Sequence, residues 1–87
     1  MSENWTVREA RDIPYARAQL WDSKPNCSAV ITCDIGWSEF KVVCVTVEDA
    51  FRYLDNLASG QGVYGMYTFR SIKIGTALDL LRDTIYE

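Results

Sequence analysis

Three cysteine thiols are the strongest nucleophiles in this 87-residue sequence, which contains no histidine. Cys27, Cys33 and Cys44 therefore have no imidazole to serve as a base, and a Cys–His catalytic pair is excluded. Their spacing also lacks the C-x-x-C pairs typical of zinc ligands. An odd number of cysteines is unusual in a secreted disulfide scaffold. We expect free thiols packed as small hydrophobic residues in a reducing cytosol, with no catalytic, cofactor-binding or metal site.

A second candidate for chemistry is a series of carboxylates near the C-terminus. Asp79, Asp83 and Glu87 are spaced i, i+4 and i+8, which places them along one edge of a helix. Like charges at this spacing repel each other by a few tenths of a kcal/mol. A solvated polar face accounts for such a series, and a basic partner surface would offset the repulsion. We keep Asp79 and Asp83 as candidate partner-binding residues.

The segment from Gly60 to Gly65 has the glycine spacing G-x-G-x-x-G of a phosphate-binding loop. It follows a predicted helix rather than a strand, however, and no lysine follows as in a P-loop. A helix end and connector is the simpler interpretation. The formal net charge of −3 also argues against direct contact with nucleic acid, which requires a cationic track.

The aromatic residues point more clearly to a function. Three tryptophans, five tyrosines and three phenylalanines are more than a core of this size can easily bury. Tyr15, Trp21 and Trp37 fall on the outer side of the predicted sheet or at its turns, next to Asp22 and Asp34. Such residues are enriched in binding hot spots. The alternatives are that a helix covers this side or that aromatic side chains pair across strands.

These side chains are positioned by an N-terminal half that alternates between apolar and polar residues. The alternation predicts strands at residues 15–21, 28–35 and 37–45, joined by turns at 22–26 and 34–37. Short connections between consecutive strands favour an antiparallel meander. Residues 5–13 form either another edge strand or a short helical piece, and Pro14 suggests a break after them.

The C-terminal half is predicted to contain two helices. Val47, Ala50, Phe51, Leu54 and Leu57 have helical spacing, which predicts a helix at about 47–58 that starts at Thr46 and ends at Gly60. A strand is expected at 63–70 and a helix at 75–86, capped by Thr76 and Asp79. One long helix from Thr68 is the alternative. The apolar face of the last helix would comprise Ile74, Ala77, Leu78, Leu81 and Ile85.

The length allows one domain at residues 1–87, and we expect an α+β fold with three or four antiparallel strands packed against two helices. No apolar run is long enough to span a bilayer. The first five residues are neither basic nor strongly apolar, so no secretory leader is expected. These features favour a cytoplasmic location and give no sign of membrane contact.

The order of elements resembles that of small phage-encoded type I-F anti-CRISPR proteins. The resemblance is carried by the aromatic Trp21 before the first turn, by Thr46-Val47-Glu48-Asp49 opening a helix, and by Ser59-Gly60-Gln61-Gly62 after it. It implies a non-enzymatic inhibitor that occupies a surface of a host nucleoprotein complex, with Trp21 and its neighbours facing the target. If the chain is phage-encoded, it would act in the bacterial cytoplasm.

We therefore expect a protein that binds a host protein or nucleoprotein complex. An antitoxin or immunity protein would use the same kind of contact against a toxin. A small thiol protein centred on the cysteines is a further alternative. A homodimer joined through a sheet edge or an aromatic face is another.

Overall fold

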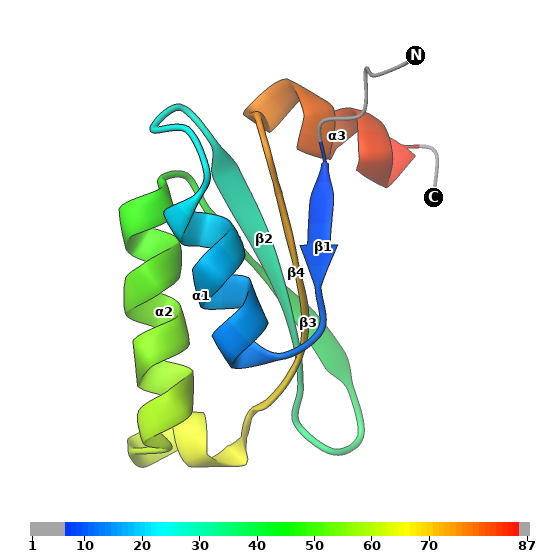
Figure 1. Ribbon diagram of the computed structural model, residues 1–87. Helices are drawn as coiled ribbons and strands as arrows, with labels where there is room; N and C mark the ends of the chain where they lie inside the picture. The colour runs from blue at the N-terminus through cyan, green and yellow to red at the C-terminus, as the bar shows by residue number, and fades with distance from the viewer. Residues whose placement is uncertain (1–6, 86–87) are drawn as a thin grey trace.

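The computed structural model describes residues 7–85, in which one antiparallel sheet is flanked by helices (Figure 1). The sheet contains β1 (Arg8–Ala10), β2 (Ser28–Asp34), β3 (Glu39–Cys44) and β4 (Thr68–Gly75). The helices are α1 (Ile13–Trp21), α2 (Val47–Ser59), the 3-10 helix η1 (Gly62–Met66) and α3 (Ala77–Ile85). The predicted α+β class with an antiparallel sheet is confirmed, and these residues form three α-helices rather than two.

The strands lie in the order β1-β4-β2-β3. Only β2 and β3 are neighbours both in the sequence and in space, and they form a hairpin with Asp34 opposite Glu39. The expected meander of consecutive strands is thus replaced by two interleaved crossovers. The connection from β1 through α1 to β2 spans β4, and the connection from β3 through α2 to β4 spans β2.

The hydrophobic core lies between one face of the sheet and the two helices α1 and α2. Cross-strand neighbours share this face, as Ile31 of β2 does with Val42 of β3 and Ile72 of β4. Leu20 of α1 and Leu54 of α2 complete this core and are almost fully buried. Helix α2 has the predicted cap, because the Thr46 hydroxyl accepts a hydrogen bond from the Asp49 N–H at 3.1 Å.

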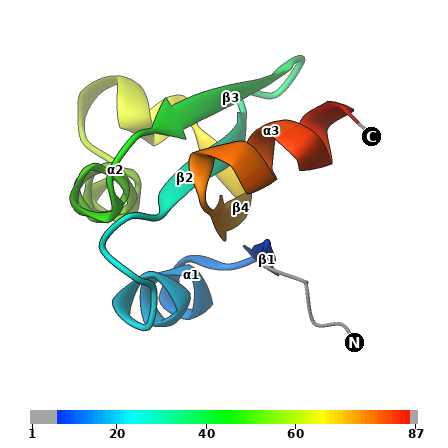
Figure 2. The ribbon, with the colours of Figure 1, turned by 90° about the horizontal axis from the view of Figure 1, so that it is seen from above.

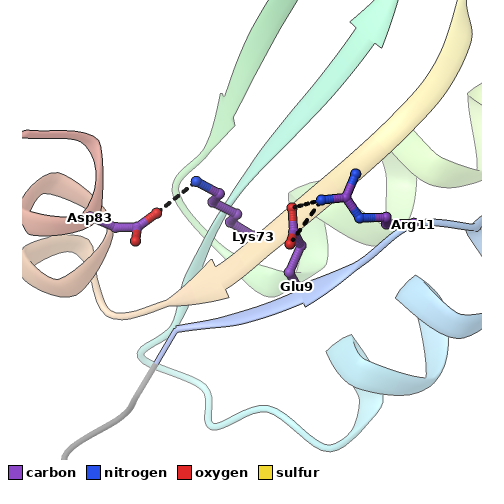
Figure 3. A network of polar contacts seen from close by, with 4 residues as sticks. All are labelled: Glu9, Arg11, Lys73 and Asp83. Carbon is purple, nitrogen blue, oxygen red and sulfur yellow. Dashed lines mark hydrogen bonds and ion pairs between the residues drawn. The ribbon is translucent and has the colours of Figure 1, made fainter. Parts of the chain in front are cut away.

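Helix α3 lies on the opposite face of the sheet, which Figure 2 shows from above. Lys73 alternates with the buried Ile72 and Ile74 along β4, so its side chain points away from the core. The Lys73 Nζ is 2.7 Å from Oδ2 of Asp83 on α3 (Figure 3). Glu9 lies opposite Lys73 on β1 and pairs with Arg11 at 3.4 Å. None of the helices in residues 7–85 has the length and apolarity needed to cross a membrane.

Residues 13–21 form a helix, so the strand predicted at 15–21 is wrong. The Asp12 carboxylate accepts a hydrogen bond from the Tyr15 N–H at 2.9 Å, and Pro14 lies in the first helical turn. Proline fits there because the first turn does not use its missing N–H. The break expected at Pro14 is therefore a helix start. Before it, β1 confirms the edge-strand alternative for the part of residues 5–13 that the structure describes.

The second half departs from the prediction in its boundaries. The strand expected at 63–70 is displaced to 68–75, because residues 62–66 form η1. A single helix from Thr68 is excluded. The final helix agrees with the prediction, and the Thr76 hydroxyl accepts a hydrogen bond from the Asp79 N–H at 3.2 Å. Its apolar face was wrongly assigned: Leu80 packs on the sheet, whereas Leu78 and Leu81 are 61% and 58% exposed.

Candidate functional site

The outward side of α1 is the most unusual surface of the described chain. Helical geometry places Pro14, Tyr15, Ala18, Trp21 and Asp22 on this side, opposite the buried Ala16 and Leu20, and all five are exposed. Tyr15 is 56% exposed and Trp21 is 80% exposed. Solvent-facing sides of helices are normally polar, but here Asp22 is the sole charged member. We call these five residues the α1 outer face.

Trp21 is held in place although most of its surface is open. Its indole packs edge-on against Phe51 of α2, with ring centroids 6.5 Å apart. The Arg17 guanidinium lies over the same Phe51 ring at 5.9 Å and forms an ion pair with Asp55. These contacts tie α1 to α2. A large aromatic side chain held in this way loses little conformational freedom on binding.

Tyr15, Trp21 and Asp22 are exposed, as the sequence predicts, but their predicted position on or beside a strand is wrong. They lie on a helix that covers the sheet rather than on the outer side of a strand. Trp37, which is 78% exposed, is not part of this surface. Trp21 precedes β2 and Trp37 follows it. Figure 1 shows the end of α1 and the β2–β3 turn, the segments that contain these residues, at opposite ends of β2.

Asp34 has a structural partner at the β2–β3 turn. Its Oδ2 is 2.7 Å from Nη2 of Arg70, and its Oδ1 accepts a hydrogen bond from the Gly36 N–H. The hydrogen bonds from Arg70 and Gly36 lower the pKa of this carboxyl. Glu39 faces Asp34 across the hairpin, and Arg70 offsets the repulsion between the two carboxylates.

The carboxylates of α3 also have local roles. Asp79 accepts a hydrogen bond from the Thr76 hydroxyl at 2.7 Å, so it belongs to the helix cap. Asp83 attaches α3 to Lys73 of the sheet (Figure 3). These two contacts give Asp79 and Asp83 structural roles that need no bound ligand. Glu87, the third member of the series, lies outside the described residues.

The glycine-rich segment is accounted for by the chain reversal after α2. Gly60 has a φ of 67° at the C-cap, a conformation that favours glycine. A Cβ on Gly65 would lie 2.8 Å from the backbone oxygen of Gly60. The segment thus packs against itself, and its glycines serve this turn.

The three thiols differ in their surroundings. Cys33 and Cys44 are buried, and burial raises the pKa of each thiol. Cys33 also shares a hydrogen bond with Tyr53, whose own pKa is raised mainly by burial. Cys27 is only partly buried. No cluster of metal-ligating side chains occurs within residues 7–85.

This difference predicts selective thiol labelling. Under native conditions, a chromogenic disulfide reagent is expected to modify one thiol rapidly and the other two slowly, because the reactive thiolate is suppressed by burial at Cys33 and Cys44. Stopped-flow absorbance would resolve the phases, and Cys27→Ser should remove the fast one. All three thiols should react together in denaturant. Equal native rates for all three would contradict the assignment.

Sequence reasoning did not find the groove beside β3. It has a volume of about 370 Å³ and lies between the edge of β3 and α2, with Val43, Val45, Arg52, Tyr53 and Tyr64 among its lining residues. Asp49 also lines it and pairs with Arg52 at 3.3 Å. Val43 and Val45 are 68% and 70% exposed. This exposure could not be predicted, because a continuous apolar run such as residues 42–45 is typical of a strand that is buried on both faces.

We compared the chain with models of known protein families, with curated proteins and with solved structures, and none of them matches.

Proposed function

We propose that this chain is a non-enzymatic protein-binding module that recognises its partner through the α1 outer face. The observation that carries the proposal is the exposure of Trp21 and Tyr15 on a helix side with little charge. An isolated exposed apolar residue needs no explanation, but a rimmed group of them is typical of an interaction site. Arg17 and Asp55 provide a polar rim beside Trp21.

The distribution of reactive groups supports a binding role over a catalytic one. Two of the three thiols are buried, and burial disfavours their nucleophilic form. The Asp34, Asp79 and Asp83 carboxylates take part in ion pairs or caps. General acid–base catalysis requires a carboxyl group with a raised pKa in a cleft, whereas the pKa of Asp34 is lowered.

The partner class that we favour is a host defence complex of a bacterium, inhibited in its cytoplasm by a phage-encoded chain. This part of the proposal rests on the local sequence resemblance to type I-F anti-CRISPR proteins at Trp21, at the helix start of residues 46–49 and at the connector of residues 59–62, because the order of elements differs at residues 13–21, which form a helix. One property is compatible with it: the net charge of −3 suits a protein surface better than nucleic acid.

Affinity capture from bacteria tests the binding surface. The tagged chain should retain a specific protein, and Tyr15→Ala combined with Trp21→Ala should weaken that interaction by about 30-fold or more, as expected for hot-spot aromatics. Leu78→Ala combined with Leu81→Ala is the matched control, because these two side chains are 61% and 58% exposed on α3, on the other face of the sheet. Equal retention by the Tyr15/Trp21 double variant, with its circular dichroism unchanged, would refute the α1 surface.

Phage plating tests the partner class. In a bacterium with an active type I-F CRISPR system, expression of the chain should restore plaque formation by a targeted phage, and the Tyr15/Trp21 double variant should not. Unchanged plating by the parent chain would refute inhibition of that system. Capture of a toxin through the same side would instead assign the chain to the antitoxins.

A further inference from the structure

We propose that the chain forms a two-fold symmetric dimer in which the β3 strands of two copies pair antiparallel. Phe40 of one copy lies opposite Phe40 of the other, with the symmetry axis midway between them. Within residues 7–85, β3 pairs with β2 alone and lies at one edge of the sheet (Figure 2). Six residues of this strand present one row of backbone groups without a strand partner. Such an edge is a template for pairing with another chain.

The register follows from the charges on the strand. Glu39, Lys41 and Val43 share the face that points away from α1 and α2, because their neighbours Phe40, Val42 and Cys44 oppose core residues of β2. In a continuous sheet, residues on the same face must lie opposite each other. One residue of β3 therefore lies opposite its own copy, and the two-fold axis passes midway between these two copies.

One register is favoured by charge complementarity. With Phe40 on the axis, Glu39 lies opposite Lys41 of the second copy, and symmetry creates this pair twice. With Lys41 on the axis, two lysines would face each other. With Val42 on the axis, both charged residues would face valines. Opposite charges stabilise cross-strand pairs and like charges destabilise them, so of these three registers only the first places each charged side chain opposite one of the opposite charge.

The same register covers exposed apolar surface. It places Trp37 of one copy opposite Val43 of the other, and these residues are 78% and 68% exposed in the single chain. Residues 42–45, which border the groove beside α2, would run alongside residues 35–38 of the second copy. The hairpin turn of each copy would thus lie next to the groove of the other.

The dimer leaves the α1 outer face open. In the sheet order β1-β4-β2-β3, α1 contacts β1 and β4, whereas the proposed dimer uses the far edge, β3. The two proposals therefore rest on separate surfaces. Dimerisation is tested with the purified chain alone and does not depend on the partner.

Charge reversal provides the test, read by sedimentation equilibrium over a concentration series. The parent should be a dimer, and Lys41→Glu and Glu39→Lys should each weaken association by about tenfold or more, because each creates two repulsive pairs. Mixing the two variants should restore association, since a heterodimer of Glu39→Lys with Lys41→Glu has two attractive pairs. Lys24→Glu makes the same charge change as Lys41→Glu on an exposed residue of the α1–β2 connection, outside β3, and it should behave like the parent.

Circular dichroism of each variant verifies folding. Glu39→Lys needs this control most, because Glu39 lies near Arg70 and a lysine at this position would repel it. Should Glu39→Lys not fold, Trp37→Ala is the second variant, and it should weaken the dimer while Lys24→Glu does not. A parent that stays monomeric at every concentration would overturn the proposal. Dimers that are insensitive to both reversals, or a mixture of folded variants that fails to associate, would overturn it as well.

Discussion

Leu54→Ala is expected to lower the free energy of unfolding by about 3 kcal/mol, which is the typical cost of removing a fully buried leucine side chain. Leu54 is 0% exposed and packs in the core between α2 and the sheet. Stabilities near 0.1 kcal/mol per residue give a domain of this length roughly 5–10 kcal/mol in total. One substitution would therefore remove a large share of it.

Urea denaturation followed by tryptophan fluorescence measures this loss. The midpoint should fall by about 1 M or more at a typical m-value. Leu81→Ala is the matched control, because it makes the same chemical change on a side chain that is 58% exposed, and it should cost less than about 0.5 kcal/mol. Similar losses in the two variants would contradict the assignment of the core to the side of α1 and α2.

Ala16→Leu is expected to destabilise the protein by about 2 kcal/mol, within the range found for overpacked cores. Ala16 is 0% exposed where α1 rests on the sheet, so three added carbons would push the helix outward. Ala18→Leu adds the same atoms on the exposed side of α1. Since alanine and leucine have similar helix propensities, it should be almost neutral.

This pair of variants also tests the secondary structure of residues 13–21 directly. In a strand, Ala16 and Ala18 would share a face and both substitutions would have similar effects. In a helix, the two positions lie on different sides and the effects should separate. Thermal unfolding followed by circular dichroism is sufficient for the comparison. Equal losses would reject the helix and, with it, the α1 outer face.

Segments whose apolar residues follow only a helical or only a strand period have the secondary structure that the sequence predicts. Val47, Leu54 and Leu57 have helical spacing between a capping threonine and Gly60, and α2 occupies Val47–Ser59. The β2–β3 hairpin followed from alternation around a glycine turn, and the structure contains it. In these segments local propensity, pattern and capping all agree.

The strand prediction for residues 15–21 was wrong because α1 is not amphipathic. With apolar residues on both sides, Ala16, Ala18 and Leu20 also fit the alternation of a strand, and only Asp12 and Pro14 mark the helix start. Exposure of Tyr15 and Trp21 could therefore be predicted, but not their grouping with Ala18. The groove beside β3 could not be predicted, because it depends on how α2 lies against the edge of the sheet.

The interleaved sheet also affects how the chain matures on the ribosome. β4 is synthesised after β1, β2 and β3, yet it lies between β1 and β2 and pairs with both. Until residues 68–75 have emerged, β1 has no neighbour and the inner edge of β2 stays open. A nascent chain can close the β2–β3 hairpin early, because its contacts are local. The assembled sheet, and the support that it gives α1, forms only after residues 68–75 have emerged.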